Sequence, residues 1–170
     1  MTRVMVIGNA GGGKSTMSRA VCAAHALPYF ALDKILWRPN WVAAPKDDFD
    51  EAHRAWIERD RWLIDGYGPW ASVEDRLAAC NTVILIDLPF SVHLWWATKR
   101  QIKSIFGGYS DIPDGCSLWP VTFRLFKMMW RLHRDTRPKL IDLIYRHSEH
   151  ARIIHIRSAH ELNAFTQNPV

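Results

Sequence analysis

The sequence has few cysteines, no long uninterrupted apolar run and no dense cluster of basic residues. Its three cysteines are widely spaced, which is typical of a reducing cytoplasm rather than of a disulfide framework. The most apolar stretch, 82–98, is broken by Asp87, Pro89 and His93, so it is a poor candidate for a membrane span. We therefore expect a cytoplasmic protein that does not enter a membrane.

The sequence contains no low-complexity tract and no clear internal repeat. The chain starts directly on an apolar β-branched run, which predicts no signal peptide. Its 170 residues fit one domain, expected to span 1–170. The net charge of +5 suits an anionic ligand and is compatible with a nucleic acid. No Lys/Arg run forces the nucleic-acid interpretation.

Short apolar runs alternate with segments of helical periodicity along the chain. Alternating strands and helices predict an α/β fold with three layers, in which helices cover both faces of a parallel sheet of about five strands. We expect strands at 3–7, 29–32, 62–65, 82–88 and 153–156, and helices at 14–26, 47–60, 70–79, 91–106, 121–134, 138–150 and 159–165. The segment 37–45 is expected to be irregular, and 107–120 to be a glycine- and proline-rich loop.

The first strand leads into a phosphate-binding loop. The residues match G-x-x-x-x-G-K-S without a mismatch: Gly8, Asn9, Ala10, Gly11, Gly12, Gly13, Lys14 and Ser15. Backbone N–H groups and the start of the next helix would surround the phosphates. Lys14 is expected to bridge the β- and γ-phosphates, Ser15 to bind Mg²⁺ and Thr16 to touch the α-phosphate. No guanine-reading motif is present, so ATP is the expected nucleotide.

A phosphate loop needs a partner acid at the end of another strand, and three aspartates are candidates. Asp65 is favoured for the Mg²⁺ shell, because Gly66 after it allows a phosphate to approach closely; a strand-end turn is the alternative. Asp33 is a candidate for contact with substrate or Mg²⁺, with helix N-capping as the alternative. Asp87 is the least favoured, because Leu-Pro follows it.

The order of motifs along the chain resembles a known family. After the phosphate loop come Leu32-Asp33-Lys34 with Trp37, Pro39 and Trp41, then Trp62-Leu63-Ile64-Asp65-Gly66, Arg76, Ile86-Asp87-Leu88-Pro89, Arg100, Gly115-Cys116 and Arg137-Pro138-Lys139. This order resembles the adenylate-kinase-like P-loop proteins often labelled DNA topology modulation proteins, within the wider group of nucleotide and shikimate kinases.

The resemblance implies five parallel strands, a substrate cap at about 36–60 and an ATP lid at about 107–120. It implies that Asp65 orients a water on Mg²⁺, that Asp33 contacts the acceptor and that Arg100 neutralises the transferred phosphoryl group. With Lys14, these residues are the expected catalytic set. The run after Gly66 has no arginine to grip a monophosphate, so the acceptor stays open.

Two functional hypotheses remain at this stage. The first is a small-molecule or nucleotide kinase that transfers the γ-phosphoryl group of ATP with Mg²⁺. The second is a nucleotide-dependent regulator or DNA-associated ATPase without kinase turnover. The apolar helix expected at 121–132 predicts burial or an interface, so the protein is expected to be a monomer or a homodimer.

Overall fold

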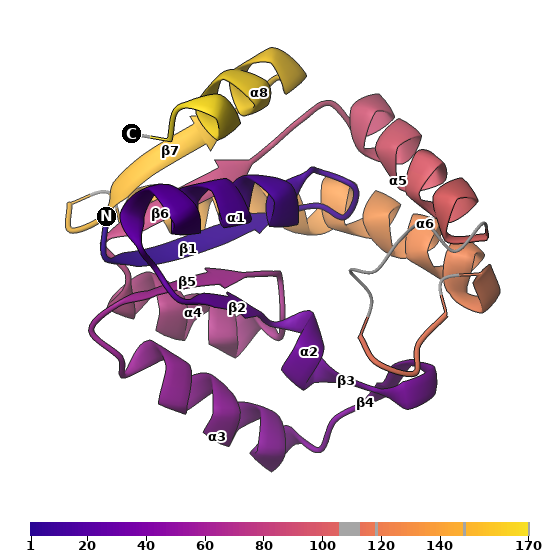
Figure 1. The fold of residues 1–170 in the computed structure, drawn as a ribbon, viewed down its shortest axis with the longest axis horizontal. Helices are drawn as coiled ribbons and strands as arrows, with labels where there is room; N and C mark the ends of the chain where they lie inside the picture. The colour runs from indigo at the N-terminus through magenta and orange to yellow at the C-terminus, as the bar shows by residue number, and fades with distance from the viewer. Residues whose placement is uncertain (106–112, 118, 148, 170) are drawn as a thin grey trace.

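A five-stranded parallel sheet forms the centre of the molecule (Figure 1). The computed structural model describes residues 1–105, 113–117, 119–147 and 149–169. The strands are β1 (Arg3–Gly8), β2 (Tyr29–Ala31), β5 (Trp62–Asp65), β6 (Thr82–Ile86) and β7 (Arg152–Ile156). Their order is β2-β5-β1-β6-β7, so the strand that leads into the phosphate loop lies in the middle.

Helices cover both faces of this sheet. In Figure 1, α1 (Lys14–His25) and α8 (Ala159–Gln167) lie on one face, and α3 (Lys46–Ile57) and α4 (Trp70–Ala79) on the other. The three-layer α/β prediction is therefore confirmed. Because the strands are parallel, their carboxyl ends share one edge, and that edge is where ligands bind in such sheets. The helix α5 (Phe90–Ile105) begins beyond this edge, after β6.

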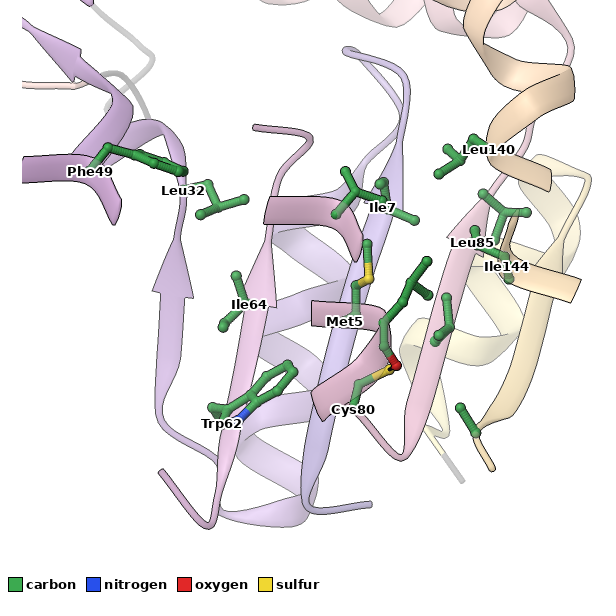
Figure 2. Close-up of a cluster of buried hydrophobic side chains, with 14 residues drawn as sticks. Met5, Ile7, Leu32, Phe49, Trp62, Ile64, Cys80, Leu85, Leu140 and Ile144 are labelled. Carbon is green, nitrogen blue, oxygen red and sulfur yellow. Dashed lines mark hydrogen bonds between the residues drawn. The ribbon is translucent and has the colours of Figure 1, made fainter. Parts of the chain in front are cut away.

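The continuous apolar strands are explained by burial on both faces. Along β1, Met5 and Ile7 pack into the core on the α4 side, whereas Val4 and Val6 pack into the core under α1 and α8. Figure 2 shows the first cluster, in which side chains of the sheet meet Leu140 and its neighbours. Each fully buried side chain of this kind contributes about 1.5–3 kcal/mol, so the sheet is a rigid base for the site at its edge.

The segment predicted as irregular contains regular structure, which corrects the expectation. A one-turn helix α2 (Asp33–Leu36) is followed by two short antiparallel strands, β3 (Trp37–Arg38) and β4 (Val42–Ala43). The turn between them holds Asn40 at φ 62° and Trp41 at φ 60°. Pro39 and Asn40 are typical turn residues, but a two-residue strand is too short to show a period in the sequence.

This hairpin contacts the described part of the predicted lid. The N–H of Asn40 donates to the carbonyl of Gly115 (3.0 Å), and the indole N–H of Trp41 donates to the carbonyl of Ser117 (2.6 Å). The remainder of the predicted lid, 107–112 and 118, lies outside the described residues. Segments far apart in the sequence, the predicted cap and the end of the predicted lid, are thus hydrogen-bonded to each other.

The two helices expected at 121–134 and 138–150 form one continuous helical stretch. It comprises α6 (Thr122–Arg131), a π-helical turn (Leu132–Thr136) and α7 (Arg137–Arg146). Pro138 lies at the start of α7, directly after the π-helical turn, and does not interrupt the helical stretch. Within the described residues, no helix is long and apolar enough to cross a bilayer.

The apolar helix α6 is only partly covered. Met129 is fully buried, whereas Phe123 is 83% exposed and Trp130 is 48% exposed. Trp130 rests edge-on against Phe90 at the start of α5, with the ring centroids 5.2 Å apart. The expectation of a homodimer through this helix stays a prediction.

Candidate active site

The backbone of the loop between β1 and α1 requires glycine. Gly8 has a φ of +156°, and a side chain there would place its Cβ 2.3 Å from the carbonyl oxygen of Ile86. Gly11 has a φ of +68°, and its Cβ would lie 2.5 Å from the carbonyl oxygen of His93. Glycine is the residue that adopts such conformations without strain. The motif glycines therefore let the loop lie tightly against β6 and α5.

The start of α1 is left open toward this loop. Its N-cap, Gly13, has no side chain to accept a hydrogen bond from the first-turn N–H groups. Those N–H groups have no intrahelical acceptor, and the helix dipole adds partial positive charge at the same point. Thr16 is exposed in this first turn. The arrangement is an anion-binding helix start of the kind that holds phosphates.

The side chains of the loop are held by local contacts. The Lys14 ammonium donates to the carbonyl of Asn9 (2.8 Å), arching back over the loop. Asn9 accepts from the N–H of Ala10 (2.8 Å) and donates to the carbonyl of Met129 in α6 (2.8 Å). Burial lowers the pKa of Lys14, although the charges of Asp65 and Asp33 act in the opposite direction. A phosphate in the loop would provide a closer counter-charge for this ammonium.

Asp65, at the end of β5, meets the loop directly. The Ser15 hydroxyl donates to Asp65 Oδ2 (3.1 Å), and so does the Tyr29 hydroxyl (3.1 Å). Asp65 Oδ1 is buried and has no hydrogen-bond partner among the described residues. Burial raises the pKa of Asp65, with Lys14 and the hydroxyl of Ser15 opposing the shift. A buried carboxylate oxygen without a donor, beside a hydroxyl, suits Mg²⁺, which prefers oxygen ligands and keeps several waters or phosphate oxygens.

Asp33 and Arg100 complete the predicted set. Asp33 is the first residue of α2, and the N-cap position is taken by Leu32, so Asp33 is not the N-cap residue of this helix. Its neighbours partly desolvate the carboxyl and raise the pKa of Asp33, whereas Lys14, Arg100 and a hydrogen bond with the Trp37 side chain lower it. The side chain is nevertheless exposed to solvent, so the effect of desolvation is weaker than at Asp65. Arg100 on α5 acts electrostatically on both Lys14 and Asp33. The four residues therefore interact electrostatically, since Lys14 is influenced by Asp65, Asp33 and Arg100.

Two buried residues that the sequence did not single out for this site support it. His93 on α5 is 1% exposed, and its Nδ1 lies 3.1 Å from the carbonyl oxygen of Ala10. Burial lowers the pKa of His93 to about 4, so its ring is neutral against the loop at pH 7. Arg76 on α4 is fully buried and donates to the carbonyls of Gly66 (2.9 Å) and Tyr67 (2.6 Å). It fixes the chain directly after Asp65.

Asp87, the least favoured partner acid, has its counter-charges within the protein. Arg137 donates to both of its carboxylate oxygens (2.5 and 2.7 Å), and His155 Nε2 lies 3.0 Å from Oδ2. Burial would raise the pKa of Asp87, but these contacts outweigh it and lower the pKa. The acid that is hydrogen-bonded to Ser15 of the phosphate loop is Asp65 and not Asp87.

A metal site made only of protein ligands is not found in the described part of the chain. No group of three or more His, Cys, Asp or Glu residues is placed to hold a metal ion there. His147 and His150 contact each other edge-on, and their ring nitrogens face the carbonyls of Leu143 and Leu77. The pairing of Ser15 with Asp65 is therefore the candidate Mg²⁺ site, with phosphate and water as the other ligands.

Solved structures of small-molecule kinases share this fold. Shikimate kinase from Acinetobacter baumannii in complex with shikimate has a TM-score of 0.62 at 12% identity, over 99% of this chain and 90% of that chain. A gluconokinase from Sinorhizobium meliloti 1021 has a TM-score of 0.54 at 13% identity, over 99% and 95%. A sugar kinase from Janibacter sp. HTCC2649 has a TM-score of 0.53 at 15% identity, over 98% and 94%. No protein-family model and no curated protein sequence matches this chain.

These similarities establish the fold as that of the nucleoside monophosphate and shikimate kinase-like P-loop proteins. At such low sequence identities, these similarities show the fold and not the function. The chemistry has to be argued from the side chains at the edge of the sheet.

Proposed function

We propose that this protein is a kinase that transfers the γ-phosphoryl group of ATP, with Mg²⁺, to a small-molecule acceptor. The observation that carries the proposal is the contact between Ser15 and Asp65 (3.1 Å) beside the phosphate loop. This contact joins the hydroxyl of Ser15 to the carboxylate of Asp65, the two groups that a Mg²⁺-bound nucleotide needs. Asp65 Oδ1 remains buried without a hydrogen-bond donor. The kinase-like fold of the solved neighbours supports the same reading.

The nucleotide with its Mg²⁺ supplies the phosphoryl group and part of the charge neutralisation. The chain would supply positioning and electrostatic stabilisation, which dominate catalysis of phosphoryl transfer. Lys14 would hold the β- and γ-phosphates, the loop N–H groups and Thr16 would hold the remaining phosphate oxygens, and Ser15 with Asp65 would hold the metal. Arg100 would stabilise the negative charge on the transferred group.

The acceptor would bind beside Asp33. This carboxyl is open to solvent and lies within electrostatic reach of both Lys14 and Arg100, so it can accept a hydrogen bond from a hydroxyl and orient that oxygen toward the phosphoryl group. Its raised pKa makes it a better proton acceptor than an ordinary aspartate. A small hydroxyl compound or a nucleotide would satisfy this geometry.

The test is a screen of ADP formation from ATP and Mg²⁺ across nucleoside monophosphates, sugars and hydroxy acids. We expect one acceptor class to raise ADP formation well above the rate with water alone. We expect Lys14→Ala to lower that rate by about 10²- to 10³-fold, because it removes a charge that stabilises the transition state. Lys127→Ala, which removes an exposed lysine on α6, is the matched control and should retain the rate.

Tight ATP binding beside a flat screen would overturn the kinase proposal. In that case, binding to DNA with a salt-dependent affinity would favour the DNA-associated regulator considered from the sequence. Equal losses in Lys14→Ala and Lys127→Ala would also count against the assigned role of the loop.

A further inference from the structure

A hollow opens at the carboxyl edge of the sheet beside β6 and β7, where Asp87 and Arg157 follow these strands. Its volume is about 500 Å³, within the range of small-molecule sites in proteins. Its polar lining comprises Asp87, His133, Arg137, Tyr145, His155 and Arg157. None of these is a residue of the predicted catalytic or phosphate-binding set. We call this hollow the β6–β7 cleft.

The polar part of the β6–β7 cleft is held in place by a chain of contacts. Asp87 is held by Arg137 through two bonds and by His155 Nε2. On the other side of the imidazole, His155 Nδ1 lies 2.9 Å from the Tyr145 hydroxyl and 3.3 Å from the Arg157 guanidinium. An Nε2–H tautomer satisfies all of these contacts, because it donates to the carboxylate while Nδ1 accepts. The lining is therefore ordered before any ligand arrives.

The charge of the β6–β7 cleft is positive. Its lining carries two guanidinium groups, Arg137 and Arg157, against the single carboxylate of Asp87. Asp87 is already engaged by Arg137 and His155. In the described chain, the Arg157 guanidinium forms no ion pair; Glu161 accepts from the Arg157 backbone N–H (2.8 Å), and the charge of Arg157 contributes to lowering the pKa of Glu161. The Arg157 charge remains available to an anion.

The rest of the lining is apolar. Leu88, Pro89 and Ile141 line the cleft together with the ring of Tyr145. A ligand that combines an anionic group with an apolar body would match both parts. The cleft also adjoins the phosphate loop, because Asp87, His133 and Arg137 line a narrower crevice that reaches Gly8 and Asn9.

We propose that the β6–β7 cleft is a binding site for a small organic anion, a carboxylate or a phosphate monoester with an apolar body, separate from the phosphate loop. Arg157 binds the anionic group, Arg137 and His155 set the position of that group, and the apolar wall holds the body. The proposal does not depend on kinase activity, because the Lys14 side chain takes no part in it.

The test uses histidine ring resonances in NMR spectra, since His133 and His155 report the cleft directly. Benzoate and phenyl phosphate are the probes, and inorganic phosphate is the comparison without an apolar body. We expect saturable shifts of both histidines with at least one of the two aromatic probes, and weaker binding of inorganic phosphate. Whichever of benzoate and phenyl phosphate binds with the higher affinity shows whether the cleft prefers a carboxylate or a phosphate group. Lys14→Ala should show the same affinity as the wild type.

Arg157→Gln should weaken binding by at least ten-fold, and Arg157→Lys should restore part of it. Arg152→Gln is the matched control, because Arg152 is exposed at the opposite end of the same strand. Thermal melting checks that each variant is folded. The proposal is overturned if neither aromatic probe gives saturable shifts, if Arg157→Gln binds as well as Arg152→Gln, or if Lys14→Ala abolishes the shifts and so places the anion in the phosphate loop.

Discussion

Asp65 and Asp87 occupy equivalent places on the sheet, but their surroundings shift the pKa values of the two carboxyl groups in opposite directions. Asp65 ends β5, Asp87 directly follows β6, and both lie at the carboxyl edge beside the central strand. Burial raises the pKa of Asp65, which has one oxygen without a partner in the described structure. Arg137 and His155 lower the pKa of Asp87 and occupy both of its oxygens.

The difference favours Asp65, rather than Asp87, as the acid that would bind a ligand. The counter-charges of Asp87 come from within the protein, so Asp87 stabilises the fold. Asp65 is incompletely neutralised by Lys14 and two hydroxyl groups, so a cation from outside would improve its environment. A site that is poorly satisfied without ligand is typical of function.

The largest expected effect is that of Asp65→Asn. We expect phosphoryl transfer to fall by about 10²- to 10³-fold, because the Mg²⁺ shell loses its anionic ligand. The pKa of Asp65 is raised in the folded state, so its ionisation destabilises the ligand-free fold as pH rises above the ordinary value of 3.8. The variant should therefore melt at a higher temperature than the wild type at pH 7. Steady-state kinetics and thermal melting measure the two effects.

Asp87→Asn is the control for that experiment, since it removes the same charge on the other side of the central strand β1. It should lower the melting temperature and leave most of the transfer rate. Equal kinetic losses in the two variants would contradict the division of roles.

The second largest expected effect is the loss of stability when the ion pair between Arg137 and Asp87 is removed. Arg137→Ala leaves the nearly buried Asp87 with His155 alone, and we expect a loss of about 1–3 kcal/mol in the free energy of unfolding. A lowered carboxyl pKa gives stability that is present above 3.8 and disappears as pH falls through the folded-state value. The difference from the wild type should therefore shrink below about pH 4 in denaturant titrations. Arg134→Ala, which breaks an exposed pair with Asp135, should change stability little at any pH.

A smaller effect concerns the neutral imidazole against the phosphate loop. The pKa of His93 falls from 6.5 to about 4 on folding, so the unfolded chain binds more protons between these values. Stability should decrease as pH falls from 6.5 toward 4. His93→Gln should flatten this part of the profile, measured by urea unfolding. His160→Gln, an exposed substitution, should retain the slope; a flattened slope there would contradict the assignment.

The sequence predicted the features that are local and periodic. The continuous apolar runs of β1 and β6 identified buried strands, and the spacing from Gly8 to Ser15 identified the loop. The sequence also placed Asp65 and Asp33 at the correct edge, because carboxyl ends of parallel strands share it. These predictions needed only neighbouring residues and one general rule of topology.

What could not be predicted depends on contacts between distant segments. Nothing near His93 indicates that its ring meets Ala10, and nothing near Tyr29 indicates its bond to Asp65. The pairing of Arg137 with Asp87 spans 50 residues. Two separate helices were expected at 121–134 and 138–150, although a π-helical turn joins α6 and α7 into one stretch. Tertiary placement, rather than local propensity, decided each of these.

The smallest expected effect lies at the hydrogen bonds between the β3–β4 hairpin and the end of the predicted lid. Trp41→Phe removes the indole N–H that donates to Ser117 (2.6 Å) but keeps an aromatic ring beside Trp37. We expect a loss of about 0.5–1 kcal/mol or less in global stability, because the bond is exposed to water. If this contact holds the two segments together around ligands, the KM for ATP or acceptor should rise two- to five-fold while kcat changes little, since the variant leaves the residues at the phosphate loop in place. Trp95→Phe, at an indole that is 57% exposed on α5, is the matched control. Identical KM values for the two variants would show that this contact is a resting arrangement without influence on binding.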